Sequence, residues 1–370
     1  MLHPHRESNI VRVACRYPTV SPTTLGAGEP FGAGGELSVV IVVDLGDRYQ
    51  FVTQPDHADL AGQFADHWGG DVDRPTPFES LVVAAYLHDV GWEAYDRRPR
   101  LDDGEPVDFR GMPADPWVPL YEEGIDAVVD LDPYAGLLVS LHGAGLRNQR
   151  YGLSPEWPET PPEFEAFVER EERRQRRLLD DLLAGGHTES EDATGTDGTD
   201  ETDTARSLSA ADDAALSAMH DPDRVPEDSG GRLWDDYRRL QAWDALSLAF
   251  CITDAPPGYD EVGPVPAGDG SETLSITRSG GADTRETAGD GVFTIDPYPF
   301  DTAPLVVTVP MRTVDKAALD VATVDESTLD GATAAGATVD GATSGYRPAL
   351  ARAYYGAGRK TRSFTLRPGN

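Results

Sequence analysis

The stretch that most constrains the fold runs from Thr76 to Trp92 and reads TPFESLVVAAYLHDVGW. Thr76 fits an N-cap, Pro77 fits the first helical position, and Glu79 fits the carboxylate of a capping box. The residues between these signals and Gly91 are almost all apolar. This pattern predicts a helix that is buried on all sides and ends near the glycine.

His88 and Asp89 lie in the last turn of this predicted helix. Two adjacent ionisable groups at the end of a buried helix cost free energy unless a partner compensates for their lost hydration. The pair therefore predicts a bound divalent metal ion.

The charge of the chain is strongly acidic. Among 370 residues, 31 are Lys or Arg and 65 are Asp or Glu, which gives a formal net charge of −34. Only Lys316 and Lys360 are lysines. Such an acidic, lysine-poor surface is typical of proteins from salt-loving organisms, because high ionic strength screens the repulsion between like charges. The same charge disfavours binding to nucleic acid, whose phosphates it would repel.

The two cysteines, Cys15 and Cys251, are too few for a disulfide scaffold, which fits a reducing compartment. The first residues lack the apolar segment of a signal peptide, and no apolar run reaches the length of a membrane span. We therefore expect a soluble cytoplasmic protein without a membrane partner.

The pattern of apolar residues predicts helices in the middle of the chain and strands at both ends. The predicted N-terminal strands are Ile10–Tyr17, Leu37–Val43 and Tyr49–Thr53. The predicted helices are Pro55–Trp68, Thr76–Trp92, Leu120–Leu131, Pro133–Gly143, Glu163–Ala184 and Leu233–Thr253. The predicted C-terminal strands are Glu272–Arg278, Leu305–Arg312 and Ser363–Arg367.

The expected fold is mainly α, a helical core with a small antiparallel sheet formed by the N- and C-terminal strands. We expect an N-terminal β segment at 1–53, a metal-binding helical core at 54–255, and a β-containing segment at 256–370 that packs on the core. An acidic insertion at about 185–210 has almost no apolar residues and is predicted to be disordered. The stretch from Tyr95 to Pro119 is predicted to be a long, functional loop.

Further candidate ligands lie on the apolar faces of other predicted helices. His57 shares a face with Leu60 and Phe64, and Asp244 lies in the middle of a buried stripe. His142 lies on the stripe of the helix 133–143. A carboxylate at the centre of an apolar face requires a partner.

The order His57, His88-Asp89, Asp244 resembles the HD-domain superfamily of metal-dependent phosphohydrolases. Within it, the phrases QPDHADLAGQ, AAYLHDVGW, SLHGAG and WDALSL are similar to a family of unknown function found in bacteria and archaea. The resemblance covers roughly residues 50 to 255. It implies an all-helical fold in which these four residues bind the metal and Asp89 and His142 are catalytic. His142 would bind a second metal or a substrate oxygen.

Imidazoles and carboxylates together suit Mn²⁺, Fe²⁺ or Zn²⁺, and a metal-bound water is a usable nucleophile near neutral pH. Arginines follow both motifs, and Arg97, Arg98 and Arg147 predict a small anionic substrate. Trp92 is a candidate for stacking on a base. The alternatives are arginines paired with surface acids and a tryptophan that only packs.

We therefore predict a metal-dependent phosphohydrolase that acts on a small phosphoester or nucleotide through a metal-activated water. Two alternatives stay open. One is an iron-dependent HD-type oxygenase, which needs two metals and more histidines than the chain places well. The other is a metal- or nucleotide-binding sensor without turnover. The sequence does not indicate an oligomeric state.

Overall fold

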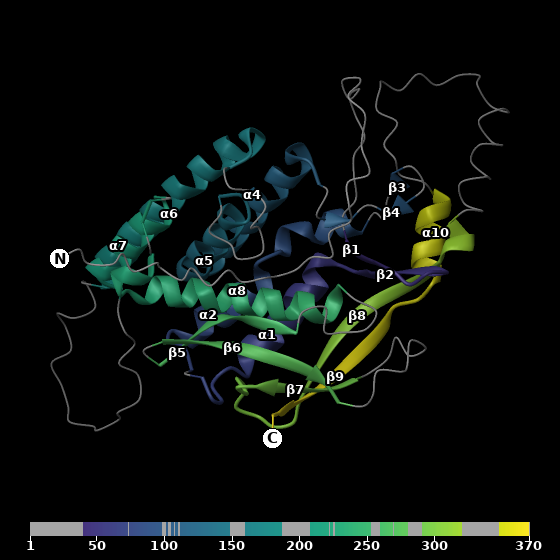
Figure 1. The fold of residues 1–370 in the computed structure, drawn as a ribbon. Helices are drawn as coiled ribbons and strands as arrows, with labels where there is room; N and C mark the ends of the chain where they lie inside the picture. The colour runs from purple at the N-terminus through teal and green to yellow at the C-terminus, as the bar shows by residue number, and fades with distance from the viewer. Residues whose placement is uncertain are drawn as a thin grey trace, which may run out of the picture.

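Figure 1 shows the computed structural model of the chain. It describes residues 40–97, 101–102, 105–106, 108–109, 112–148, 160–186, 208–252, 260–279, 291–319 and 348–369, except positions 73, 222, 225 and 269. The predicted strand at 10–17 and most of the acidic insertion lie outside these residues.

The described helices occupy mainly the middle of the chain. They are α1 (Gln54–Asp66), α2 (Phe78–Leu87), α3 (Glu93–Asp96), α4 (Ala114–Leu131), α5 (Pro133–Gly145), α6 (Glu165–Gly186), α7 (Ala210–Met219), α8 (Arg232–Cys251) and α10 (Pro348–Gly356). Short 3-10 turns are η1 (Val90–Trp92), η3 (Pro162–Phe164) and η4 (Pro226–Ser229). None of the described helices combines the length and the hydropathy that a membrane span requires.

The strands form one large sheet. They are β1 (Ile41–Asp44), β2 (Arg48–Val52), β5 (Glu261–Ala267), β6 (Gly270–Arg278), β7 (Gly291–Asp296), β8 (Leu305–Asp315) and β9 (Lys360–Pro368). Their order is β1-β2-β8-β9-β7-β6-β5, and β3 (Leu101–Asp102) pairs separately with β4 (Glu105–Pro106). In the large sheet, β7 and β9 are parallel and the other neighbours are antiparallel.

This architecture corrects the predicted fold class. The prediction of a mainly α fold with a small antiparallel sheet is wrong, because the sheet has seven strands and is mixed. Two of the missed strands explain the error. β5 contains Pro264 and Pro266, which are tolerated because β5 is the edge strand, and β7 is only six residues long. The expected pairing of N- and C-terminal strands is present, since Phe51 of β2 lies opposite Arg312 of β8.

The sheet packs against α1 and α8, which separate it from α4, α5 and α6 (Figure 1). The side-chain amide of Gln63 on α1 bonds to both backbone groups of Thr308 on β8, at 2.8 and 2.9 Å. Phe250 of α8 packs on Phe293 and Phe364 of the sheet, with ring centroids 5.1 and 4.8 Å away. One apolar core therefore joins the helices to the sheet, while the division into three segments stays a prediction.

The central helix differs from its prediction in three ways. α2 begins at Phe78, with Pro77 as its N-cap and no capping hydrogen bond from a side chain. Its fully buried residues are Leu81, Ala84 and Ala85, so one face rather than the whole helix is buried. The helix ends at Leu87, and His88 and Asp89 follow it directly instead of lying in its last turn.

The stretch predicted as a long loop after Trp92 contains regular structure. α4 begins at Ala114, six residues before its predicted start, and holds Pro119 inside the helix. The predicted loop ended at Pro119 because proline cannot continue the hydrogen bonding of a helix interior. The predicted start of α5 at Pro133 is confirmed, and Asp132 caps the helix by accepting hydrogen bonds from the backbone of Tyr134 and Ala135, both at 2.9 Å.

Candidate metal centre

Five ionisable side chains from four parts of the chain meet in the helical layer. His57 comes from the first turn of α1, His88 and Asp89 from the end of α2, His142 from α5 and Asp244 from α8. All five are buried, with no more than 4% of any residue exposed. Donor atoms of His57, His88 and Asp244, and of His88, Asp89 and His142, lie within 4.8 Å of one another in each group.

The start of α1 places His57. Thr53 is the N-cap, and its hydroxyl accepts a 3.2 Å hydrogen bond from the backbone N–H of Asp56. Asp96 accepts a 2.7 Å bond from the N–H of Gln54 and so satisfies a second free donor of the first turn. The Nε2 atom of His57 then lies 3.0 Å from Asp89 Oδ2 and 3.5 Å from Asp244 Oδ1.

The turn after α2 depends on a glycine. Gly91 packs against the backbone of α4, where a Cβ atom would lie 2.0 Å from the carbonyl oxygen of Leu120. The glycine is therefore needed for close approach to α4 and not for a left-handed helix end, because Gly91 is absent from the positive-φ glycines of the described chain. The approach brings Tyr121 of α4 to Asp89, and its hydroxyl donates a 2.9 Å hydrogen bond to Asp89 Oδ1.

Hydrogen bonds on the far side of each ring assign the histidine tautomers. His88 Nδ1 lies 2.8 Å from the carbonyl oxygen of Ala85, so it carries the proton and donates. His57 Nδ1 lies 2.6 Å from Ser247 Oγ, whose own hydrogen is donated to the carbonyl of Asp244 at 2.8 Å. Ser247 must therefore accept from His57 Nδ1. In their neutral forms, the rings of His57 and His88 both direct an Nε2 lone pair into the space between them and the carboxylates of Asp89 and Asp244.

The consequence is a group of four acceptors that face one another. His57 Nε2 and His88 Nε2 are 3.2 Å apart, and His88 Nε2 lies 3.6 Å from Asp89 Oδ2 and 3.5 Å from Asp244 Oδ1. Two lone pairs and two carboxylate oxygens repel one another unless a cation lies among them. The arrangement fits a divalent ion bound by nitrogen and oxygen.

Without an ion, a proton supplies that positive charge. Burial by itself lowers the pKa of His88, but the charges of Asp89 and Asp244 outweigh it and raise the pKa to about 9. Burial tends to raise the pKa of Asp89, but the charge of His88 outweighs it and holds the pKa of Asp89 well below its usual range. Asp89 is therefore ionised at neutral pH, which suits a ligand better than a proton acceptor.

His142 lies beside the four-acceptor group. Its ring centroid is 4.9 Å from that of His88. Burial, and then the charge of His88, lower the pKa of His142 to about 4, so its imidazole is neutral at neutral pH. Because Nδ1 of His88 is bonded to Ala85, His88 offers only Nε2 as a ligand atom and can serve one ion. This supports one metal, with His142 as an added ligand or a hydrogen-bonding group.

The residues predicted to bind substrate do not gather at this centre. Arg97 is exposed and ion-pairs with Glu93, while Arg98 lies outside the described residues. The Arg147 guanidinium lies 4.2 Å from the ring of Trp117 and 4.1 Å from that of Phe164. Trp92 is buried against Tyr95 and Tyr121, with ring centroids 6.2 and 5.8 Å away, which is a packing arrangement.

Two residues of the centre were missed from the sequence, Ser247 and Tyr121. Ser247 follows Asp244 by three positions on the same buried face of α8, a spacing that could have revealed it. Tyr121 lies on the buried stripe of α4 with Trp117, Ile125 and Val128. A buried tyrosine hydroxyl requires a partner, but its identity depends on how α4 crosses α2.

The chain belongs to the family described as "Protein of unknown function (DUF3891)", whose model matches residues 40–316. The matched range includes all five residues of the centre. No HD-domain model matches, so the resemblance to the HD-domain superfamily was wrong. A short His and Asp order is weak evidence of ancestry, because unrelated folds converge on the same ligand chemistry. No curated protein and no solved structure matches the chain.

Proposed function

We propose that this protein is a hydrolase that holds one divalent metal ion between His57, His88, Asp89 and Asp244 and cleaves a small phosphoester. The observation that carries the proposal is the pair of Nε2 atoms, 3.2 Å apart, whose rings both carry their proton on Nδ1. Because neither nitrogen can donate to the other in the neutral state, the site is organised for a cation.

The donor set suits Zn²⁺, Mn²⁺ or Fe²⁺, and the identity of the ion stays a prediction. When bound, such an ion lowers the pKa of water and polarises a phosphoryl oxygen. Other side chains of the protein would orient the ligands and transfer protons. Tyr121 orients Asp89, Ser247 orients His57, and the neutral imidazole of His142 is able to accept a proton or a hydrogen bond beside the ligands.

A small anionic substrate is favoured by the charge of Arg147. This guanidinium follows the end of α5 that carries His142, and it is held between two aromatic rings with 7% of the residue exposed. A guanidinium on the chain just after the helix that carries His142 is suited to binding a phosphate group through its N–H donors. The phosphoester is proposed on this basis, and no nucleic acid or membrane partner is part of the proposal.

Burial favours a second candidate, a metal-binding sensor without turnover. All five residues are no more than 4% exposed, and closed sites are typical of structural metals, whereas catalytic sites keep an open position. The oxygenase alternative has less support, since it needs two ions and His88 has one ligand atom to offer.

The first experiment is elemental analysis of the wild-type protein and of the double variant His88→Ala, Asp89→Ala, both purified in molar KCl. The matched control is His67→Ala with Asp301→Ala, which removes another His–Asp pair, 3.2 Å apart at the protein surface. We expect one equivalent of a transition metal in the wild type and the control, and none in the double variant.

Turnover separates the two candidates. The metal-loaded protein is assayed on a panel of nucleotides and small phosphomonoesters and phosphodiesters, with the double variant as the blank. Phosphate release that requires the metal supports the hydrolase, and one bound metal without turnover supports the sensor. Absence of metal from the wild type, with unchanged stability after chelation, would exclude both.

A further inference from the structure

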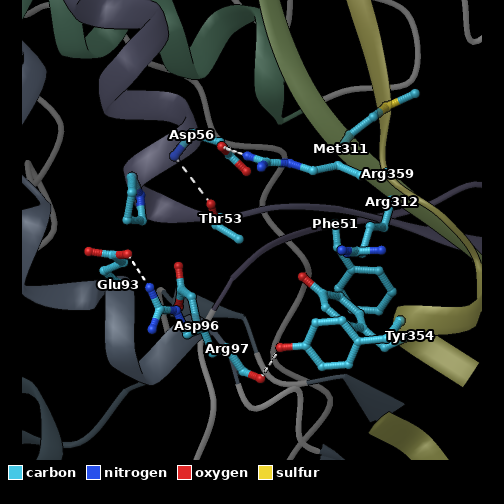
Figure 2. A pocket seen from close by; sticks show the side chains of 12 residues that line it. Phe51, Thr53, Asp56, Glu93, Asp96, Arg97, Met311, Arg312, Tyr354 and Arg359 are labelled. Carbon is cyan, nitrogen blue, oxygen red and sulfur yellow. Dashed lines mark hydrogen bonds and ion pairs between the residues drawn. The ribbon is translucent and has the colours of Figure 1, made fainter. Parts of the chain in front are cut away.

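A second site lies on the opposite side of the first turn of α1. A pocket of about 300 Å³ lies between this turn, α3, the strands β2 and β8, and α10. Figure 2 shows the side chains that line it. Asp56 lines the pocket, whereas its neighbour His57 faces the metal centre. The residues of the metal centre do not line the pocket, so the two sites can be tested separately.

Two of the three arginines that line the pocket are in ion pairs. Arg359 ion-pairs with Asp56, and Arg97 ion-pairs with Glu93 (Figure 2). Arg312 is in no ion pair among the residues that the structure describes, and its charge acts on Asp56 only at longer range, where it opposes the rise in pKa that burial causes. Its guanidinium instead lies 5.0 Å from the ring of Tyr354 and 5.1 Å from that of Tyr355. In a chain with 65 acidic and 31 basic residues, an arginine that lines a pocket and makes no ion pair with the described residues is available to an anionic ligand.

Asp96 supplies a second unused polar group. It is 2% exposed and lines the pocket, and its Oδ2 accepts from the backbone of Gln54 at 2.7 Å. Its Oδ1 is buried and has no hydrogen-bond partner in the described part of the chain. An unpaired buried carboxyl oxygen is costly, so a ligand that bonds to it would recover free energy.

The protonation of Asp96 agrees with an anionic ligand. Burial raises the pKa of Asp96 well above its usual range, against the lowering effect of the Gln54 N–H, and the charges of Asp89 and Asp56 raise it further. In its neutral form Asp96 does not repel an anion, and its free oxygen is able to donate a hydrogen bond. The backbone donors at the start of α1 are already used by Asp96 and Thr53.

We propose that this pocket binds a small organic oxyanion, a carboxylate or a phosphate, between Arg312 and Oδ1 of Asp96. The walls include Phe51, Met311 and Tyr354, so the body of the ligand is apolar or aromatic. A volume of about 300 Å³ corresponds to a molecule of roughly the size of a substituted benzene ring.

The test uses the full chain after chelation, so that metal binding plays no part. Isothermal titration in a constant KCl buffer compares benzoate and benzylphosphonate with the neutral benzamide. We expect saturable binding of one equivalent of at least one of the two anions, and at least tenfold weaker binding of benzamide. The tighter of the two anions identifies carboxylate or phosphate as the preferred group.

Arg312→Gln should weaken binding at least tenfold. The matched control is Arg352→Gln, an exposed arginine of α10 that does not line the pocket, and it should bind as the wild type does. Asp96→Asn should bind within about threefold of the wild type, because an amide accepts from Gln54 and donates into the pocket. The proposal is overturned if neither anion binds, if benzamide binds as tightly, or if Arg312→Gln changes nothing.

Discussion

Ser247 lies three residues after Asp244 on α8 and reaches across to α1, where its Oγ is 2.6 Å from His57 Nδ1. Its hydroxyl hydrogen is donated to the carbonyl of Asp244. One serine therefore fixes the ring of one proposed ligand while bonding to the backbone of another. Residues that hydrogen-bond to a metal ligand without touching the metal orient that ligand and adjust the affinity of the site for the metal.

Replacement of Ser247 by alanine should weaken metal affinity by about 10- to 100-fold, because His57 loses the acceptor that fixes its tautomer. Competition with a chelating dye measures the change. Ser140→Ala is the matched control, since Ser140 is equally buried but bonds to Glu171 and Gln175 away from the centre. Equal affinities of the two variants would contradict the orienting function of Ser247.

Tyr121→Phe should lower both stability and metal affinity. The variant leaves Asp89 Oδ1 without its 2.9 Å hydrogen bond, which costs about 1.5–3 kcal/mol for a bond to a charged group. Urea unfolding in molar KCl and metal titration measure the two effects. Tyr134→Phe removes a similar buried bond, from Tyr134 to Asp236 at 2.6 Å, and should reduce stability while leaving metal affinity unchanged.

Metal affinity should increase with pH. Because the pKa of His88 is raised to about 9 in the metal-free protein, an ion must displace a proton from this ring at neutral pH. We expect affinity to rise about tenfold per pH unit below pH 9 and then to level off. Calorimetry in buffers with different ionisation enthalpies should count about one released proton per ion at pH 7. Binding that is independent of pH, with no proton released, would refute this assignment.

The stability of the metal-free protein should fall as pH rises from 6.5 to 9. The folded pKa of His88, about 9, lies above the ordinary value of 6.5. Its contribution to stability is therefore complete below pH 6.5 and is lost as pH passes 9, by up to about 3 kcal/mol. Urea unfolding after chelation measures the slope. His88→Gln should remove this pH dependence, and an unchanged slope in that variant would assign it to another group.

Gly91→Ala should be strongly destabilising. The new Cβ atom would lie 2.0 Å from the carbonyl oxygen of Leu120, so the turn after α2 and α4 would have to separate. We expect a loss of about 3 kcal/mol or more in the free energy of unfolding, together with weaker metal binding as Tyr121 moves away from Asp89. Gly356→Ala is the control, because its Cβ would contact nothing within 4 Å. Equal stability of the two variants would show that α4 tolerates the displacement.

The five residues of the centre could be named from the sequence for a definite reason. A helix places residues three or four positions apart on one face, so a polar group within an apolar stripe is visible in the sequence, as for His57 and Asp244. The sheet was less visible. The two prolines of β5 argue against a strand when the sequence is read alone. They are tolerated because β5 lies at the edge of the sheet, and that position depends on how distant strands pair.

The arginines show the limit of the same reasoning. Arg97 and Arg147 were grouped because each follows a motif, yet one ion-pairs at the surface with Glu93 and the other lies between two aromatic rings. Arg312, which lines the second pocket and is in no ion pair among the described residues, lies on a strand, and no motif adjoins it. Proximity in sequence did not predict proximity in space for these long side chains.

By itself, the sequence determined the acidic character of this protein, most of its helices and the identity of the five candidate ligand residues. These properties depend on composition and on local periodicity. Tertiary structure alone decided that Ser247 and Tyr121 hold the candidate ligands, that seven strands form one mixed sheet, and that Arg312 and Asp96 share a pocket. Hydrogen bonds act over about 3 Å, so they depend on how distant elements cross, which local sequence patterns do not encode.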